Sequence, residues 1–223
     1  MTAAPPRLVL ATRNPHKVHE LRRILSDAGL PVDLVDLVGI EAFDQVDGVD
    51  VPEVAETGIT FAENALLKAH AVAVATGLPA IADDSGLCVD VLGGSPGVFS
   101  ARWSGRHGDD AANLRLLLEQ LADVDEPHRT GFFGCAAVLA TPQRQEWIAE
   151  GRMTGELIKA PRGSNGFGYD PIFVPDGESR TSAELSAAEK DAISHRGRAF
   201  RALLPQITDL MSGSPRLRDV STP

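Results

Sequence analysis

The order of apolar and polar positions predicts that the chain begins with a strand, a helix and a second strand. The apolar run over 7–12 is typical of a buried strand. Apolar residues then recur at helical spacing, and Gly29 suits the end of that helix. A second apolar run over 31–38 predicts another strand. The turn between the first strand and the helix is therefore expected to be short.

The clearest helix is predicted over 60–77. Thr60 and Glu63 have the spacing of a capping box at its start. Asn64 and Lys68 are four residues apart, so they share one face of this helix, separate from its apolar face.

The rest of the pattern predicts an α/β protein with an antiparallel portion. Residues 79–92 are expected to form a strand that reaches two aspartates, turns at 85–86 and resumes as a strand. A glycine-rich segment over 93–105 and a helix over 109–123 follow. Residues 130–158 are expected to form two or three antiparallel strands with a turn at 142–143. A short strand over 171–174 and a helical region over 181–207, interrupted near 194–195, complete the pattern. The polar residues 212–223 are predicted to be a disordered tail, and residues 1–211 a single domain.

Composition narrows the possible partners. The net charge of -10 and pI of about 5.0 argue against a nucleic-acid or membrane-surface binder, because both need a basic face. A small anionic ligand is still possible, since a local group of cations or a metal can hold a phosphate. Cys88 and Cys135 lie far apart in apolar stretches and are expected to be buried thiols. Without a secretory signal or a long apolar run, a cytoplasmic protein is expected.

The segment ATRNPHK, residues 11–17, is a candidate anion site where a strand leads into a helix. Backbone N–H groups and the helix dipole favour an anion at such a position. Thr12 and Asn14 add hydrogen-bonding side chains, and Lys17 adds a positive charge. The alternative is a polar turn in which Asn14 caps the helix.

The segment IADDSG, residues 81–86, is a candidate metal site. Asp83 and Asp84 would repel each other at the end of an apolar strand, and a hard divalent cation relieves that repulsion. Mg2+ prefers a few carboxylates together with waters and substrate phosphates. Glu53 and Glu56 are further candidate ligands. The alternatives are an Asx turn at the aspartates and solvated charges at the two glutamates.

The segment SNGFGYDP, residues 164–171, places an aromatic ring on an open loop. Glycines flank Phe167, so the backbone can turn sharply and the ring can stack on a flat ligand. Farther along, Lys190, His195 and Arg196 lie close together and can donate hydrogen bonds to an oxygen-rich ligand. The alternative for these three is a surface helix with basic residues near its end. An anion site, a metal site, a stacking ring and donors for a base together fit a nucleoside triphosphate.

Five segments carry a resemblance to a known family. LATRNPHKVHELRRIL, ETGITFAENALLKA, AIADDSGLCVDVLGGSPGVFSARWSG, GSNGFGYDPIFVP and ELSAAEKDAISHRGRAF occur in order between residue 7 and about residue 204. They resemble the inosine triphosphate pyrophosphatase family, the dITP/XTP pyrophosphatases. The resemblance implies a two-lobed α/β fold, with a long twisted mixed sheet flanked by helices and a central cleft. It also implies a homodimer that hydrolyses nonstandard purine nucleoside triphosphates (dITP/ITP and XTP/dXTP) to the monophosphate and pyrophosphate with Mg2+, which cleanses the nucleotide pool.

The resemblance also implies roles for individual residues. Asp84 is the expected catalytic carboxylate and metal ligand, with Asp83 beside it. Glu53 matches a second metal ligand that only some members have. The expected substrate contacts are Thr12, Arg13, Asn14, Pro15, His16, Lys17, Lys68, Ser85, Phe167, Gly168, Tyr169, Asp170, Lys190, His195 and Arg196. Arg13 is a departure, because many members carry glycine there.

Two other functions remain open from the sequence. The protein could cleave other modified nucleoside triphosphates, such as modified pyrimidine nucleotides, or it could bind nucleotides without catalysis. The presence of Asp83, Asp84, Lys17 and Lys68 argues against an inactive protein.

Overall fold

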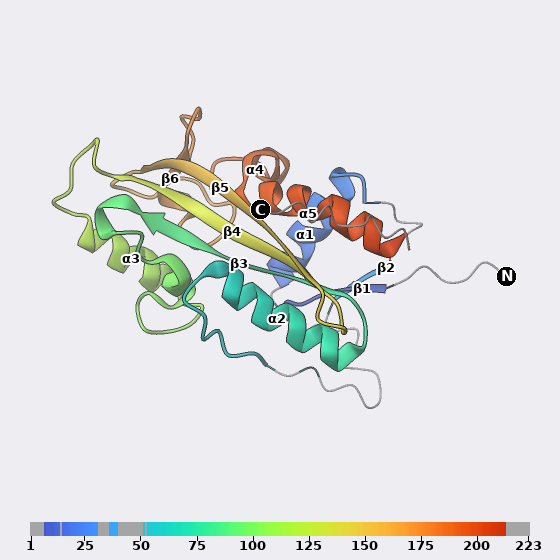
Figure 1. Ribbon diagram of the computed structural model, residues 1–223. Coiled ribbons are helices and arrows are strands. Elements are labelled where there is room, and N and C mark those ends of the chain that lie inside the picture. The colour runs from blue at the N-terminus through green and yellow to red at the C-terminus, as the bar shows by residue number, and fades with distance from the viewer. Residues whose placement is uncertain (1–6, 14, 31–35, 40–50, 52, 213–223) are drawn as a thin grey trace, which may run out of the picture.

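A single mixed sheet organises the molecule (Figure 1). The computed structural model describes residues 7–13, 15–30, 36–39, 51 and 53–212. The sheet has six strands in the order β2-β1-β3-β4-β5-β6. Their bounds are β1 Arg7–Leu10, β2 Asp36–Gly39, β3 Ala80–Val89, β4 Thr130–Ala140, β5 Glu146–Leu157 and β6 Phe173–Pro175. Strand β1 is parallel to β2 and β3, whereas β3 to β6 are antiparallel. The predicted α/β class and mixed sheet are confirmed.

Five α-helices and three short 3-10 helices are present in the described part of the chain. The α-helices are α1 Pro15–Asp27, α2 Phe61–Thr76, α3 Asp110–Gln120, α4 Ala187–Ile193 and α5 His195–Met211. The 3-10 helices are η2 Asp90–Leu92, η3 Gly97–Arg102 and η4 Asp170–Ile172. Both halves of the predicted capping box of α2 form, and the predicted interruption near 194–195 separates α4 from α5. The predicted disordered tail lies outside the described residues, apart from Ser212.

The two faces of the sheet pack against different helices. Side chains alternate between the faces of a strand, so Leu8 and Leu10 point to one side and Val9 to the other. The first side forms a core with α1 and α5, and the second packs against α2. A third apolar core lies at the far end of the sheet, around α3 and β6. Three cores on one long sheet agree with the expected two-lobed shape, and Figure 1 shows α3 at the end remote from β1 and β2.

The predicted turn at 85–86 is wrong. Strand β3 continues without interruption, and Ser85 and Gly86 pair with Cys135 and Gly134 of β4. The glycine serves close packing instead of a turn, because a Cβ at position 86 would lie 2.4 Å from the backbone oxygen of Gly97. The long antiparallel ladder with β4 therefore outweighs the local turn signal of Ser-Gly.

An uninterrupted β3 has a direct consequence for the paired aspartates. Consecutive residues of a strand point to opposite faces, so Asp83 faces α1 and α5, whereas Asp84 faces α2. Within the described residues, β1 pairs with β3 only at Ala80 and Ile81. No strand pairs with this edge of β3 from Ala82 to Ser85 in the described residues, so both carboxylates reach the same gap beside the strand. Farther along, residues 95–100 close the edge again through contacts with Leu87, Cys88 and Val89.

Candidate active site

The predicted site residues meet in one cleft. Its volume is about 580 Å³, within the size range of small-molecule sites. The predicted residues that line it are Thr12, Arg13, Lys17, Glu53, Glu56, Lys68, Asp83, Asp84, Ser85, Phe167, Gly168, Tyr169, Asp170, Lys190, His195 and Arg196. Asn14 and the side chains of Pro15 and His16 lie outside the described part of the structure. The cleft follows the open edge of β3, between the part of the sheet covered by α2 and the part covered by α3.

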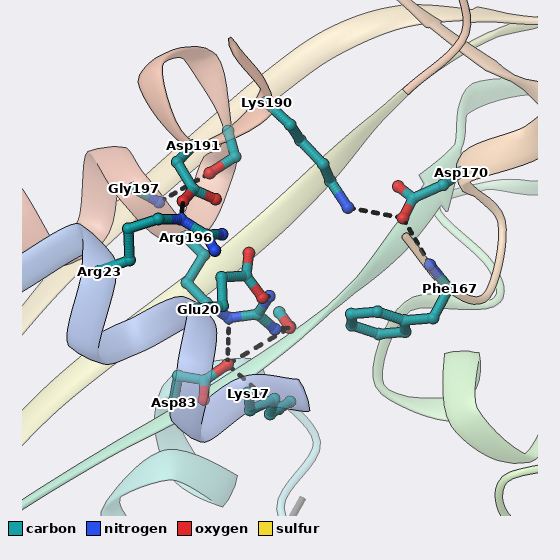
Figure 2. A network of polar contacts seen from close by, with 12 residues as sticks. Lys17, Glu20, Arg23, Asp83, Phe167, Asp170, Lys190, Asp191, Arg196 and Gly197 are labelled. Atoms are coloured by element: carbon teal, nitrogen blue, oxygen red, sulfur yellow. Dashed lines mark hydrogen bonds and ion pairs between the residues drawn. The ribbon is translucent and has the colours of Figure 1, made fainter. Parts of the chain in front are cut away.

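Asp83 forms the centre of a buried ion-pair network (Figure 2). Its Oδ2 accepts hydrogen bonds from Lys17 Nζ and from Arg196 Nε, both at 3.1 Å. Arg196 also donates to Glu20 at 2.7 Å and to the hydroxyl of Ser85 at 2.8 Å. Burial on its own raises the pKa of a carboxyl group, but Lys17 and Arg196 outweigh it and hold the pKa of Asp83 well below its usual range. Asp83 is therefore charged at neutral pH, and the network fixes its position.

Asp84 lies in a different environment on the other face of β3. Its Oδ2 accepts a hydrogen bond from Asn64 Nδ2 at 3.1 Å, and Lys68 Nζ lies 3.5 Å from its Oδ1. The ammonium of Lys68 is closer to Glu56, at 2.7 Å. Burial raises the pKa of Asp84; Lys68 opposes this shift without reversing it, and the negative charge of Glu56 adds to it. The less neutralised carboxylate is therefore Asp84, and it is the better proton acceptor of the two.

The loop that carries Phe167 is held by two aspartates. Asp170 is buried, and its Oδ2 accepts a hydrogen bond from Phe167 N at 2.9 Å and forms an ion pair with Lys190 (Figure 2). Asp110, at the start of α3, accepts a hydrogen bond from Gly168 N at 3.0 Å. The ring of Phe167 is 38% exposed, and Lys190 Nζ lies 5.4 Å from its centroid. The loop thus presents an open aromatic face in a fixed orientation.

Tyr169, His195 and Arg196 have most of their polar groups turned into the protein. The hydroxyl of Tyr169 donates to the backbone oxygen of Ser100 at 2.9 Å. His195 stacks on Phe133 with centroids 5.0 Å apart; burial, followed by the charge of Arg196, lowers its pKa well below 6.5. His195 is therefore neutral at pH 7. Substrate contact by these three residues stays a prediction.

The carboxylates of the cleft fit a magnesium ion better than a metal that needs a full set of protein ligands. Within the described ranges, no three His, Cys, Asp or Glu side chains are grouped closely enough to hold a metal. Oδ1 of Asp83 is buried and has no hydrogen-bond partner there, and Asp84 is incompletely neutralised. Glu53 is exposed at the cleft. Mg2+ commonly takes one or two carboxylates and completes its shell with water and substrate phosphates.

Two groups in the site carried little signal in the sequence. Arg102, from η3, contacts Glu56 at 3.4 Å and lines the cleft, but its segment has no periodic pattern. Asn64 is completely buried behind Asp84. Its position four residues before Lys68 indicated that the two share a face, although not which group that face meets.

The mixed sheet, the pair of carboxylates in different environments and the open aromatic ring define an α/β protein with a cleft suited to a polyanionic ligand that carries a flat ring. The chain belongs to the Ham1 family, whose model matches residues 8–206. The resemblance to the inosine triphosphate pyrophosphatases is thereby confirmed. In the part of the chain that the structure describes, no helix is long and apolar enough to cross a membrane.

Several relatives cover nearly the whole chain. A protein of Streptomyces avermitilis named dITP/XTP pyrophosphatase is 64% identical over 92% of this chain and 98% of its own length. A protein of Streptomyces coelicolor with the same name is 63% identical over 92% of this chain and 98% of its own length. A crystal structure of nucleoside-triphosphatase / dITP/XTP pyrophosphatase from Mycobacterium abscessus has a TM-score of 0.71 and 52% identity, and covers 90% of this chain and 99% of that one. A HAM1 protein from Coxiella burnetii has a TM-score of 0.77 and 40% identity, over 93% of this chain and 99% of that one.

Proposed function

We propose that this protein hydrolyses nonstandard purine nucleoside triphosphates, namely dITP/ITP and XTP/dXTP, to the monophosphate and pyrophosphate. The carrying observation is the buried, incompletely neutralised Asp84 in the same cleft as Lys17, Lys68 and the open ring of Phe167. Relatives that are 50 to 64% identical bear the name dITP/XTP pyrophosphatase, which agrees with this activity. The proposed role is removal of deaminated purine nucleotides before they enter DNA or RNA.

The proposed reaction is an attack of water on the α-phosphorus. Asp84 accepts the proton of the water as the new oxygen–phosphorus bond forms. The bond between the α-phosphorus and the bridging oxygen breaks, and pyrophosphate leaves with the electron pair. Lys17 and Lys68 stabilise the negative charge that develops on the phosphates, so positioning and electrostatics supply most of the rate enhancement.

Mg2+ is the proposed cofactor. Asp84 and Glu53 would hold it, together with Oδ1 of Asp83, since among the described residues only Oδ2 of Asp83 is paired with Lys17 and Arg196. The bound ion would lower the pKa of a coordinated water and neutralise phosphate charge. We also expect a homodimer in the cytoplasm; light scattering on the purified protein tests the oligomeric state.

Base selectivity follows from stacking and hydrogen bonding at the Phe167 end of the cleft. The ring of Phe167 would stack on the purine, and side-chain donors such as Lys190 would bind the 6-oxo group of hypoxanthine or xanthine. Adenine would place its 6-amino donor against those donors. A buried donor without an acceptor costs about 1–3 kcal/mol, which corresponds to a discrimination of roughly 5- to 150-fold.

A substrate panel tests the proposed function. The purified protein is assayed with Mg2+ against dITP, XTP, ATP, GTP and modified pyrimidine triphosphates, with separate detection of pyrophosphate and orthophosphate. Faster release of pyrophosphate from dITP and XTP is the expected result. Preference for a pyrimidine triphosphate would favour the alternative hydrolase, and binding without turnover would favour a nucleotide-binding protein.

Replacing Phe167 with alanine is expected to raise KM for dITP by about 10-fold while kcat changes little. Loss of a stacked base costs about 1–3 kcal/mol, and the ring is remote from the carboxylates in the proposed binding mode. Phe132→Ala is the control, because Phe132 packs under Arg152 outside the cleft. Steady-state kinetics of the wild type and both variants measure the effect. If the KM of Phe167→Ala equals that of the wild type, Phe167 does not bind the base.

A further inference from the structure

A buried asparagine stands directly behind the proposed catalytic carboxylate. Asn64 is the fourth residue of α2, and its side chain is 0% exposed. Asparagine is a poor residue for a helix interior, and burial of an amide is unfavourable unless its hydrogen bonds are made. Both ends of this amide are bonded, to Gly58 and to Asp84. The contacts therefore compensate for a residue that neither helix formation nor apolar packing favours.

The bond to the loop determines which way the amide points. A backbone N–H can only donate, and Gly58 N donates to Asn64 Oδ1 at 2.8 Å. The amide nitrogen must then be the atom that faces Asp84 Oδ2, at 3.1 Å, and it can only donate. Oδ2 of Asp84 is thereby held as an acceptor, which disfavours a proton on that oxygen.

The loop that contains Gly58 fixes the side chain of Asn64 on the side away from Asp84. A Cβ at position 58 would lie 2.8 Å from Asn64 Oδ1 and 2.6 Å from Glu63 Cβ, so only glycine permits this close approach. Thr60 and Glu63 fix the loop to the first turn of α2 through the capping box. The asparagine is consequently held by a rigid loop on one side and meets the carboxylate on the other.

We propose that Asn64 is a positioning residue that occupies Oδ2 of Asp84 and leaves Oδ1 to accept the proton of the attacking water. Lys68, one turn later on α2, does not hold Oδ1 as tightly, because it lies 3.5 Å away and 2.7 Å from Glu56. Helix α2 thus meets the two oxygens of one carboxylate with a close neutral donor and a more distant cation. This inference rests on the proposed function, since it assigns a task to each oxygen in that reaction.

The test compares the same substitution at two buried asparagines. Asn113, on α3, is 1% exposed, and its Oδ1 accepts a hydrogen bond from Ser104 N at 2.7 Å. It does not line the cleft. Aspartate at either position keeps an oxygen for the loop N–H. Only in Asn64→Asp does the second oxygen face another carboxylate, so the hydrogen bond donated to Asp84 Oδ2 is lost and the two oxygens repel each other.

Asn64→Asp is expected to lower kcat for dITP by about 100-fold, at the low end of the contribution of a general base. KM is expected to stay within about 3-fold, because Asn64 does not line the cleft. Asn113→Asp is expected to keep the wild-type kcat. A merely structural role for Asn64 predicts that both variants keep kcat, since both keep the loop hydrogen bond, and that result would overturn the inference.

Two further measurements separate the possible failures. Equilibrium dialysis with ITP, without divalent metal, is expected to give Asn64→Asp the wild-type Kd within about 3-fold; a 10-fold weaker Kd would make Asn64 a binding residue and overturn the inference. If Asn64→Asp does not fold, Asn64→Ala replaces it, with a lower kcat at unchanged KM expected and an unchanged kcat contradicting the inference. A wild-type protein inactive on dITP would instead overturn the proposed function.

Discussion

Replacing Asp84 with asparagine is expected to lower kcat for dITP by about 1,000-fold while nucleotide binding persists. The variant keeps an oxygen for the hydrogen bond from Asn64 but has no carboxylate to accept a proton or to bind Mg2+. Loss of a general base alone costs about 100- to 10,000-fold. Steady-state kinetics give kcat, and equilibrium dialysis with ITP gives the binding constant. A rate close to that of the wild type would remove Asp84 from the mechanism.

The same substitution is expected to leave stability unchanged or to raise it. Burial raises the pKa of Asp84 in the folded protein above its value in the unfolded chain. At a pH above the folded pKa, the charged carboxylate therefore lowers the free energy of unfolding. Asparagine removes this unfavourable charge at neutral pH. In the metal-free wild type, the pKa of Asp84 should therefore lie above that of an ordinary aspartate. Asp90→Asn is the control and should retain both activity and melting temperature, because Asp90 is an exposed residue of η2, directly after β3.

Replacing Asp83 with asparagine is expected to have the opposite effect on stability, a loss of about 3 kcal/mol. Removal of one partner of a buried ion pair leaves the other charge uncompensated, which typically costs about 3–5 kcal/mol. Here Arg196, only 2% exposed, would keep Glu20 as its single carboxylate partner among the described residues. For a chain of this length the melting temperature should fall by about 6–12 °C. Thermal and urea unfolding at pH 7 measure the change.

The pH dependence of the stability difference between the wild type and Asp83→Asn tests whether that difference is electrostatic. The pKa of Asp83 is lower in the folded protein than in the unfolded chain, so its stabilisation is complete above the unfolded pKa of about 3.9. It is lost as the pH falls from about 4 toward the much lower folded value. The difference in the free energy of unfolding between the wild type and Asp83→Asn should therefore be constant between pH 6 and 8 and decrease below about pH 4. Equal stability of the Asp83→Asn and Asp84→Asn variants would contradict the different environments of the two aspartates.

Local sequence was sufficient for features that depend on neighbours in the chain. The capping box of Thr60 and Glu63, the shared face of Asn64 and Lys68, and the helix break at Ser194 all formed as predicted. Phe167 is open on its loop because positive backbone angles at the glycines beside it turn the chain sharply on both sides. In each case the predicted feature depends on the spacing or the backbone angles of a few consecutive residues, so the local sequence is informative.

Tertiary structure decided how the two aspartates differ. The sequence DDSG indicated a turn, but pairing with β4 extended β3 through it and sent Asp83 and Asp84 to opposite faces. Asp83 then met Arg196, 113 residues away, whereas Asp84 met the neutral amide of Asn64. Sequence spacing carries no information on such contacts, because they arise only when strand pairing and helix packing bring distant segments together. The chain by itself determined which chemical groups are present, and the folded sheet determined which carboxylate is paired with cations and which meets mainly a neutral amide.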